Sequence, residues 1–167
     1  MIPEVLINTN LFVDGTSFAG DVPSFTPPKV TIKTEEFRGG GMAGSIDMAM
    51  GVEKLEASFV TTGMRRESLR FFGLADQTAC NAVFRGAFKG EKGRIKPVIA
   101  TVRGMLKEVD SGDWKAGEKA EIKHAMTLTY YKLEVDGRVI YEIDMVGAVL
   151  VIDGVDQLAD VRAALGL

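Results

Sequence analysis

The chain has 167 residues, a hydrophobic content of 46% and a formal net charge of −3. This length and composition predict a single domain, residues 1–167, with its own packed core. The negative charge argues against a general nucleic-acid binder, which normally carries a basic surplus. The single cysteine, Cys80, excludes an internal disulfide and a multi-cysteine metal cluster.

The sequence shows no signal for membrane insertion or export. It has no stretch of about 18 consecutive apolar residues, which a transmembrane helix would need. Its start, MIPEVLINTN, lacks the basic segment and apolar core of a secretory signal. We therefore expect a chain that is made and used in soluble form.

Residues 1–28 are predicted to form an extended N-terminal arm. Asp14 and Gly15 give a hairpin-type turn signal, and the prolines at 23, 27 and 28 keep the following segment out of a helix. Such an arm needs a surface to lie on. The sequence leaves open whether that surface is the chain's own sheet, where the arm would be an edge strand, or a neighbouring subunit.

Residues 29–62 are predicted to form a long hairpin with a glycine-rich tip at 37–45. Apolar and polar side chains alternate on both sides of the tip, as in half-buried strands. The alternation changes phase at Lys54, which indicates a bulge or a bend. A long ribbon with a flexible end is an edge that needs a partner, so this hairpin predicts self-assembly.

The tip also matches the G-x-G-x-x-G pattern of nucleotide-binding loops, at residues 39–44. That pattern binds nucleotides only between a strand and the start of a helix. Here residues 45–52 alternate as a strand, so we expect a flexible hairpin tip and no nucleotide site.

A first short helix is predicted at residues 63–74, capped by Thr61 or Thr62 and ended by Gly73. Three arginines, at 65, 66 and 70, lie on its polar side. We favour a solvated or subunit-contacting face over an anion site, because charge runs usually solvate a helix.

A second hairpin is predicted at residues 81–109, with its turn at 90–93. Pro97 indicates that the start of the returning strand is an edge or lies outside the ladder. Residues 110–117 form a polar loop around the only tryptophan, Trp114. That side chain is either a contact anchor or a lid on the local core, and the sequence does not separate the two.

A third hairpin is predicted at residues 118–144, turning at Asp136 and Gly137. A second short helix follows at 153–166, with Gly166 as its stop and an apolar stripe of Val155, Leu158, Val161 and Leu165. Together these elements predict a mainly β fold, an antiparallel β-sandwich or partial barrel with long hairpins and two short α-helices.

The residues that carry chemistry in enzymes are sparse. The only histidine, His124, falls on the apolar phase of a predicted strand, where a core or interface imidazole is expected and not a catalytic base. Carboxylates near the loops lack the spacing of an EF-hand and are expected to be solvated. We expect no catalytic residue, no metal site and no cofactor.

Short segments along the whole chain match one known family: residues 8–15 (NTNLFVDG), 18–23 (FAGDVP), 65–67 (RRE), 71–77 (FFGLADQ), 106–110 (LKEVD), 112–118 (GDWKAGE), 130–137 (YYKLEVDG) and 154–158 (GVDQL). In the number and order of these segments the chain resembles the major tail tube proteins of contractile-tailed bacteriophages, a family that also supplies the tubes of R-type pyocins.

The resemblance implies a structural role. Hexameric rings of the subunit would stack into a hollow tube inside a contractile sheath, and neighbouring subunits would close one shared β-barrel around the lumen. The hairpins at 29–62 and 81–109 would form the barrel. The partners would be further copies, the sheath protein, the baseplate or tube initiator, the tail terminator, and DNA that passes without specific binding. The protein would lie in the virion tail, or in an extracellular tail-like particle that punctures a membrane, after synthesis in the bacterial host cytoplasm.

The resemblance also implies roles for particular residues. Candidates for contacts between rings are the N-terminal arm and the residues Phe37, Arg38, Gly39, Gly40, Gly41, Met42, Gly44, Asp113 and Trp114. Candidates for the lumen surface, where carboxylates would repel DNA phosphates, are Glu35, Asp47 and Glu53.

Two other functions remain open at this point. An inner-tube protein of a secretion system would share the fold and the stacking of rings. A small β-barrel ligand-binding module or enzyme would be a stable monomer with a closed pocket and would form no tubes.

Overall fold

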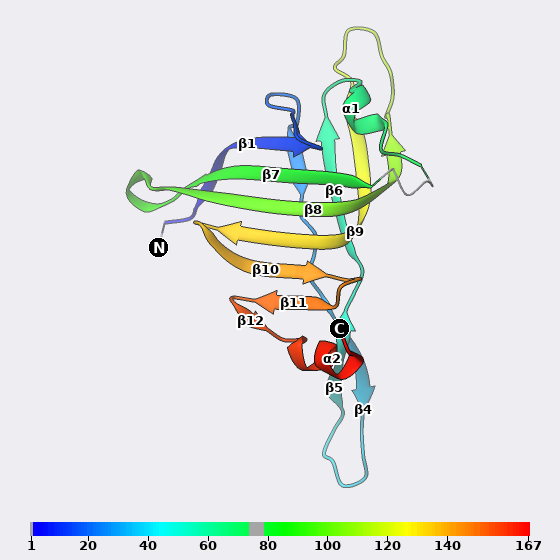
Figure 1. The fold of residues 1–167 in the computed structure, drawn as a ribbon. Coiled ribbons are helices and arrows are strands. Elements are labelled where there is room, and N and C mark those ends of the chain that lie inside the picture. The colour runs from blue at the N-terminus through cyan, green and yellow to red at the C-terminus, as the bar shows by residue number, and fades with distance from the viewer. Residues whose placement is uncertain (1, 74–78) are drawn as a thin grey trace.

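The computed structural model describes residues 2–73 and 79–167, and most of these lie in antiparallel strands (Figure 1). The mainly β class with two short α-helices is confirmed. The strands are β1 Val5–Val13, β2 Thr16–Ser17, β3 Ser24–Thr26, β4 Ile32–Phe37, β5 Ile46–Val52, β6 Leu55–Thr61, β7 Cys80–Lys89, β8 Ile95–Asp110, β9 Ile122–Val135, β10 Arg138–Asp144, β11 Val149–Ile152 and β12 Val155–Asp156. The helices are α1 Arg66–Leu69 and α2 Ala159–Leu165, with a 3₁₀ turn at Glu91–Gly93.

Ten of the described strands form one large sheet, ordered β12-β11-β10-β9-β8-β7-β1-β2, with β6 and β3 attached through β9. The sheet forks at β9. One edge of β9 pairs with β8 along almost its whole length, from Lys123 to Val135. The opposite edge pairs with β6 in its first half and with β10 in its second half.

The fork lets the large sheet fold over itself. β6 runs upright in Figure 1, whereas β7, β8, β10 and β11 run across it, an orthogonal arrangement of two layers. The rings of Phe25 on β3 and Phe84 on β7 stack at 4.5 Å although these two strands are not paired. The inner faces of both layers share one core, which includes Leu11, Leu55 and Val102. The sheet path itself stays open, ending at β2 and β12.

The bend in the long strands occurs at β-bulges. β8 and β9 change register between Arg103 and Gly104 and again between Leu106 and Glu108. A bulge inserts an unpaired residue, bends the strand and increases its twist. The two longest strands of the fold therefore belong to both layers.

The predicted hairpin at 29–62 is divided between two sheets. β4 and β5 pair only with each other and form a separate ribbon that extends from the body. After Glu53 and Lys54, β6 enters the large sheet and pairs with β9. The phase change at Lys54 thus marks the passage from one sheet to the other, and β6 is not a partner of β4.

The N-terminal arm is part of the large sheet. Its strand β1 pairs with β7 from Val5 to Val13, and β2 adds a two-residue edge beyond it. Of the two interpretations of this segment, a strand on the chain's own sheet is therefore the one that the structure shows.

Pro97 lies where the start of β8 is an edge, one of the two predicted alternatives. It pairs with Ala87 inside the β7–β8 ladder. On the other side of β8, the ladder with β9 begins only at Val98, and the Pro97 carbonyl accepts a hydrogen bond from the Asp136 backbone N–H at 2.8 Å. The Pro97 nitrogen, which has no hydrogen to donate, therefore faces the side of β8 where no strand is paired, and a proline is tolerated there.

The helices are shorter than predicted. α1 covers only Arg66–Leu69 and has no side-chain cap, and residue 74 of the predicted helix lies outside the described residues, as do residues 74–77 of the family segment. The prediction of a helix from 153 is wrong. Asp153 and Gly154 have positive φ and form a hairpin turn between β11 and β12, so Val155 is in a strand and α2 begins at Ala159. Gly166, with a φ of 75°, ends α2 as predicted.

Candidate assembly surfaces

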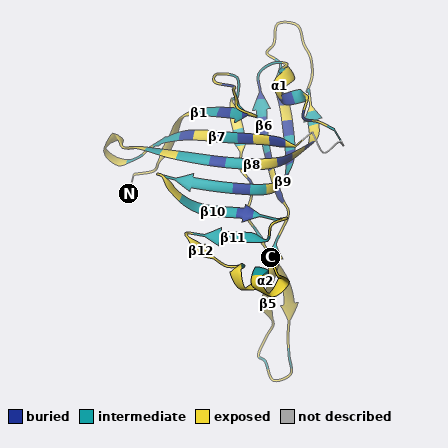
Figure 2. Ribbon diagram, in the orientation of Figure 1, coloured by how far each residue is buried: buried dark blue, intermediate teal, exposed yellow. Residues whose placement is uncertain are grey.

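The β4–β5 ribbon presents one apolar face to solvent. Directly opposed residues of an antiparallel pair lie on the same face, and here Phe37 opposes Ile46 while Glu35 opposes Met48. Phe37 is 48% exposed and Met50, on the same face, 54%. Figure 2 shows the ribbon as the most continuous exposed part of the fold. A run of exposed large apolar side chains on an unpaired ribbon is typical of a contact surface.

The other face of the ribbon is polar. Glu36 opposes Asp47, and the hydroxyl of Ser45 donates a hydrogen bond to the Glu36 carboxylate at 2.7 Å. Asp47 and Glu35 therefore lie on opposite faces. The two carboxylates therefore do not share one surface of the ribbon, and their place at the lumen stays a prediction.

Glu53, the third of these candidates, lies beyond the ribbon's bulge in the connection to β6. Its backbone N–H donates to the Thr31 carbonyl at 2.8 Å. The bulge itself falls where the register shifts between Ile32 and Thr34, opposite Gly51, which has a φ of 117°. The base of the ribbon is thus a bent, hydrogen-bonded joint.

The tip of the ribbon is a closed turn. The Gly39 backbone N–H donates to the Met42 sulfur at 3.0 Å, and the Met42 N–H donates back to the Gly39 carbonyl at 3.3 Å. Gly41 has a φ of 84°, a conformation that favours glycine. The tip joins two strands and no helix follows it, which agrees with the rejection of a nucleotide-binding loop. The remaining tip candidates, Arg38, Gly40 and Gly44, are part of the same turn.

The loop between β8 and β9 carries the two other predicted contact residues, Asp113 and Trp114. Trp114 is 71% exposed, and its indole N–H donates to the Ser111 carbonyl at 3.2 Å. The Asp110 carboxylate accepts from the Gly112 backbone N–H at 2.9 Å. Trp114 is not a lid on the core, and an exposed aromatic held in place by its own loop suits a contact anchor.

The ribbon tip and the Trp114 loop lie at opposite ends of the molecule (Figure 1). The structure therefore does not bring the two groups of predicted contact residues together within one subunit. It places one at each end, an arrangement that a sequence without three-dimensional register does not reveal.

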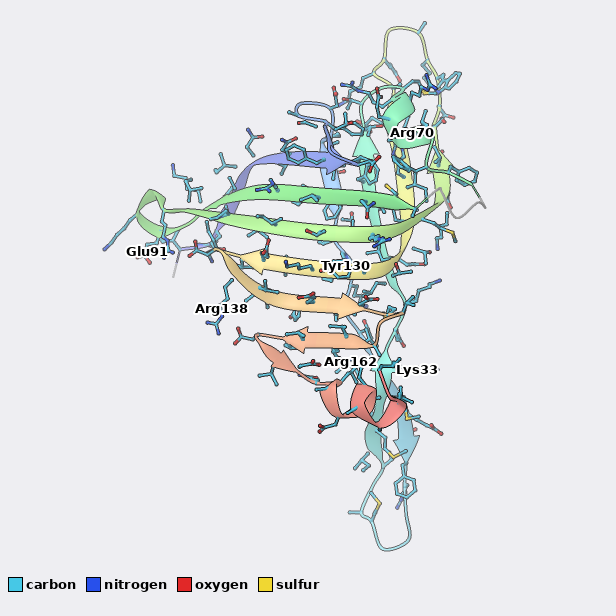
Figure 3. All side chains as sticks on the ribbon, viewed as in Figure 1. Lys33, Arg70, Glu91, Tyr130, Arg138 and Arg162 are labelled. Carbon is cyan, nitrogen blue, oxygen red and sulfur yellow. The ribbon has the colours of Figure 1, made fainter. Side chains whose placement is uncertain are left out.

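A further apolar surface surrounds α2, and the sequence prediction missed its exposure. None of the residues of α2 is buried, and Leu165 is 65% exposed. Arg162 anchors the helix through an ion pair with Asp156 and a hydrogen bond to the Ala148 carbonyl at 2.8 Å. Figure 3 shows the Arg162 side chain between α2 and β11. The apolar stripe predicted for this helix therefore faces outwards.

The arginines of the α1 segment contact the N-terminal part of the chain. Arg65 forms an ion pair with Asp21 and lies over the Phe18 ring, 5.7 Å from its centroid. Arg70 bonds Asp14 at 3.1 Å. These contacts tie α1 to the turn after β1, so the two guanidinium groups are engaged inside the subunit and do not form an anion site.

The outward face of the large sheet carries paired charges. Lys132 lies 3.7 Å from Glu134, and the Tyr130 hydroxyl donates to the Glu142 carboxylate at 3.4 Å. Burial, together with the negative charge of Glu142, raises the pKa of Tyr130. Lys132 also directly opposes Glu142 in the ladder. Lys132 is therefore offset by acidic neighbours on this face.

Reactive side chains are buried and inert. Burial raises the pKa of the Cys80 thiol to about 12, and that of Tyr131 to about 12. Across residues 2–73 and 79–167, no group of three or more His, Cys, Asp or Glu side chains is placed to hold a metal ion. In the same residues, no helix is both long and apolar enough to cross a membrane.

A surface hollow beside the β7–β8 turn is the place where a ligand site could be sought. It is lined by charged side chains that include Glu4, Arg94 and Lys96. Lys96 forms an ion pair with Glu4, and Arg94 forms one with Asp136. Three of its charged side chains are therefore engaged with neighbouring side chains, which gives the ligand-binding alternative little support.

Comparison with known proteins matches the whole length of the chain. The model of a family described as phage tail tube protein FII matches residues 3–166. The major tail tube protein of Serratia phage KSP20 is 37% identical over 169 residues, covering 99% of this chain and 98% of the relative. The tail tube protein of Escherichia phage P2 is 33% identical over 172 residues, covering 99% of each.

Solved structures share the fold at low sequence identity. A chain of the anti-feeding prophage baseplate has a TM-score of 0.59 at 14% identity and covers 80% of this chain and 97% of its own length. Chains of an extracellular contractile injection system match similarly. One from the sheath–tube complex has a TM-score of 0.59 at 11% identity, covering 80% of this chain and 91% of its own. One from the sheath and tube terminator has 0.61 at 10% identity, covering 80% and 98%.

Proposed function

The chain belongs to the phage tail tube protein FII family, and from this membership we propose that its copies form hexameric rings that stack into the hollow inner tube of a contractile tail. The family establishes the coarser statement, that this protein is a structural tail tube subunit. The number of subunits in a ring, the contacts between rings and the passage of DNA are the parts proposed here.

The observation that carries the proposal is the separation of the two contact surfaces. The ribbon extends from one end of the subunit and the Trp114 loop from the other. Two different surfaces at opposite ends make a head-to-tail contact, which repeats without limit when the rotation does not close on itself. We assign the ribbon tip and the Trp114 loop to the ring-to-ring interface.

Within a ring, neighbouring large sheets would complete one β-barrel. The open ends of the sheet path, at β2 and β12, are where strands of another copy can pair. The outward face of the sheet would line the lumen. Because Lys132 on this face is paired with Glu134 and the chain carries a net charge of −3, this face would let DNA pass without holding it.

The sheath protein, the baseplate or tube initiator and the tail terminator are the expected partners outside the tube. The fold is shared with chains from a sheath–tube complex, a baseplate and a sheath and tube terminator. The relatives above 30% identity come from phages, which favours a phage or pyocin-like tail over a secretion system.

Negative-stain electron microscopy of the purified protein over a concentration series tests the proposal. Hollow tubes of uniform width, or hexameric rings, are the expected result. If only monomers appear, tail baseplates should be added as seeds, because tube growth often needs an initiator. A protein that stays monomeric at high concentration and does not extend seeded tubes would contradict the proposal and favour the binding-module alternative.

A further inference from the structure

The only histidine of the chain forms no well-aligned hydrogen bond with any residue that the structure describes. His124 lies on β9 and is 0% exposed, and among the described residues neither ring nitrogen finds a donor or acceptor. A neutral imidazole has one N–H donor and one acceptor. Leaving such groups buried and unpaired is costly, so an apolar side chain at this position would stabilise the fold better at neutral pH.

The surroundings of His124 are apolar. Its ring stacks on Phe59 of β6, with centroids 4.5 Å apart and planes 7° from parallel. Phe59 opposes it on one side, and Val109 of β8 opposes it on the other. The Thr61 hydroxyl is buried on the same face of β6 but donates to the Gly63 carbonyl instead.

The charged side chains close to His124 on the three paired strands lie on the opposite, exposed face. They are Glu56 on β6, Lys107 and Glu108 on β8, and Lys123 on β9, and all of them are exposed. Glu56 and Lys107 bond each other at 2.6 Å. Among the described residues of these three strands, no carboxylate faces the ring that could stabilise its charged form.

His124 lies in the ladder that connects the ribbon to the large sheet. Of the strands that the structure describes, β6 pairs with β3 and β9 alone, and Glu53 and Lys54 separate it from the ribbon strand β5. The ladder of β6 and β9 is therefore the joint that holds the ribbon to the body. His124 and Phe59 are directly opposed within that ladder.

We propose that His124 makes the joint between the ribbon and the large sheet sensitive to protons, so that mild acid loosens the pairing of β6 with β9 and frees the strand that carries the ribbon. A charged imidazole cannot stay in an apolar site without a partner. When the joint opens, the ring reaches water and takes up its proton.

The direction of the pH dependence follows from burial. Burial lowers the pKa of His124 below its usual 6.5, because the charged form loses its hydration. The backbone groups of Ile122 and Phe59 lie close enough to oppose this shift, but neither meets the geometry of a hydrogen bond with the ring. In the opened joint the pKa returns to about 6.5. The closed joint is therefore fully stable above pH 6.5 and loses stability as the pH falls below that value towards the lower pKa of the closed form.

Hydrogen exchange of the full-length protein, read by mass spectrometry and corrected for the intrinsic effect of pH, tests the proposal. Between pH 7.5 and pH 5, we expect protection of β6 and β9 peptides to fall severalfold, because the opened joint takes up a proton that the closed joint binds more weakly. Peptides from β10 and β11 should keep their protection. In His124→Phe and His124→Leu the fall at β6 and β9 should disappear.

Phe59→Leu is the matched control, because it weakens the joint but keeps the imidazole. It should lower protection at both pH values and preserve the ratio between them. An equal fall in wild type and in the His124 variants would overturn the proposal, as would a fall that is uniform over the sheet. If both variants fail to fold, the wild type still decides: a loss confined to β6 and β9 supports the joint, and no such loss refutes it.

A second readout concerns tubes and rests on the proposed function. Tubes formed at pH 7.5 and moved to pH 5 should shorten or dissociate in the wild type and persist in His124→Phe. If no tubes form at any pH, the proposed function fails, while hydrogen exchange still decides the role of His124.

Discussion

At the scale of single residues, Gly104 marks a close approach between the two long strands β8 and β9. A Cβ atom at this position would lie 1.9 Å from the Thr127 carbonyl oxygen and 2.8 Å from the Leu128 Cα. Both are backbone atoms, so no side-chain rotation relieves the clash. The close approach is part of the bulge through which β8 and β9 bend between the two layers.

We expect Gly104→Ala to lower the free energy of unfolding by about 3 kcal/mol, because backbone must move to admit the methyl group. Urea denaturation followed by circular dichroism measures the change. Gly44→Ala is the matched control, since nothing lies within 4 Å of its Cβ, and it should change stability by less than about 0.5 kcal/mol. Equal effects of the two substitutions would contradict the assignment.

Cys80 gives a second prediction at this scale. Its side chain is buried, and the pKa of about 12 keeps the thiol protonated at neutral pH. Because the thiolate is the reactive form, a thiol reagent at pH 7.5 should label the folded protein far more slowly than the protein in 6 M guanidinium. Fast labelling of the native protein, followed by mass spectrometry, would show that the β7 end is open.

At the scale of elements, substitutions on the two faces of the ribbon should have opposite effects on tube assembly. Met48 and Asp47 are neighbours in sequence and lie on opposite faces, the first opposite Glu35 and the second opposite Glu36. Met48→Ser removes exposed apolar surface and should abolish or strongly shorten tubes in electron micrographs. Asp47→Ser should leave tube length nearly unchanged.

Neither substitution should move the melting temperature of the subunit by more than about 2 °C, because neither side chain belongs to the core. Loss of tubes in Asp47→Ser with normal tubes in Met48→Ser would mean that the polar face makes the contact.

The anchor of α2 gives another prediction for an element. Arg162 holds α2 against the β11–β12 end through Asp156 and the Ala148 carbonyl. Arg162→Met should increase the rate of limited proteolysis within residues 157–167 several-fold and leave the β-sheet circular dichroism unchanged. An unaltered cleavage rate would show that the apolar contacts of α2 suffice.

The same anchor has a pH dependence. The hydrogen bond from Arg162 is the main cause that lowers the pKa of Asp156 below its usual 3.8. The contribution of the pair is therefore present above about pH 3.8 and is lost as the pH falls through the lower value. In wild type, proteolysis at the C-terminus should rise only in this strongly acidic range.

The limits of prediction from sequence are clearest for elements that depend on distant partners. The alternation around Lys54 shows a change of phase, but only pairing with Leu128 and its neighbours decides that β6 leaves the ribbon for β9. Likewise, period-two alternation identifies the faces of a single strand. It does not say that Glu35 opposes Met48, since register comes from the turn and from bulges.

For the turn between β11 and β12, which the sequence prediction placed in a helix, the sequence does contain a turn signal. Asp153 and Gly154 repeat the turn dipeptide of Asp136 and Gly137, and in both pairs the two residues have positive φ. After Asp153 and Gly154, however, apolar residues follow at spacings of three and four, a pattern that predicts a helix. The four apolar residues of β11, which precede the turn, lack alternation and so resemble many other short buried segments.

At the scale of the whole molecule, charge balance predicts weak interaction with nucleic acid. The net charge is −3, and Lys132 on the outward face of the sheet is engaged by acidic neighbours. Assembled tubes should therefore retain no duplex DNA in a gel-shift assay at 150 mM salt, and little at 50 mM. Retention that falls steeply with added salt would reveal an unneutralised basic track and would contradict the proposed lumen surface.

The fork at β9 also determines how the subunit would carry a mechanical load. The limb with β6 and the ribbon and the limb with β10, β11 and α2 leave the same edge of this strand at different heights. A pull on the ribbon reaches the rest of the subunit through ladders loaded along their length, where many hydrogen bonds share the force at once. Stiffness under axial thrust would then come from β9, the one continuous strand that joins both limbs.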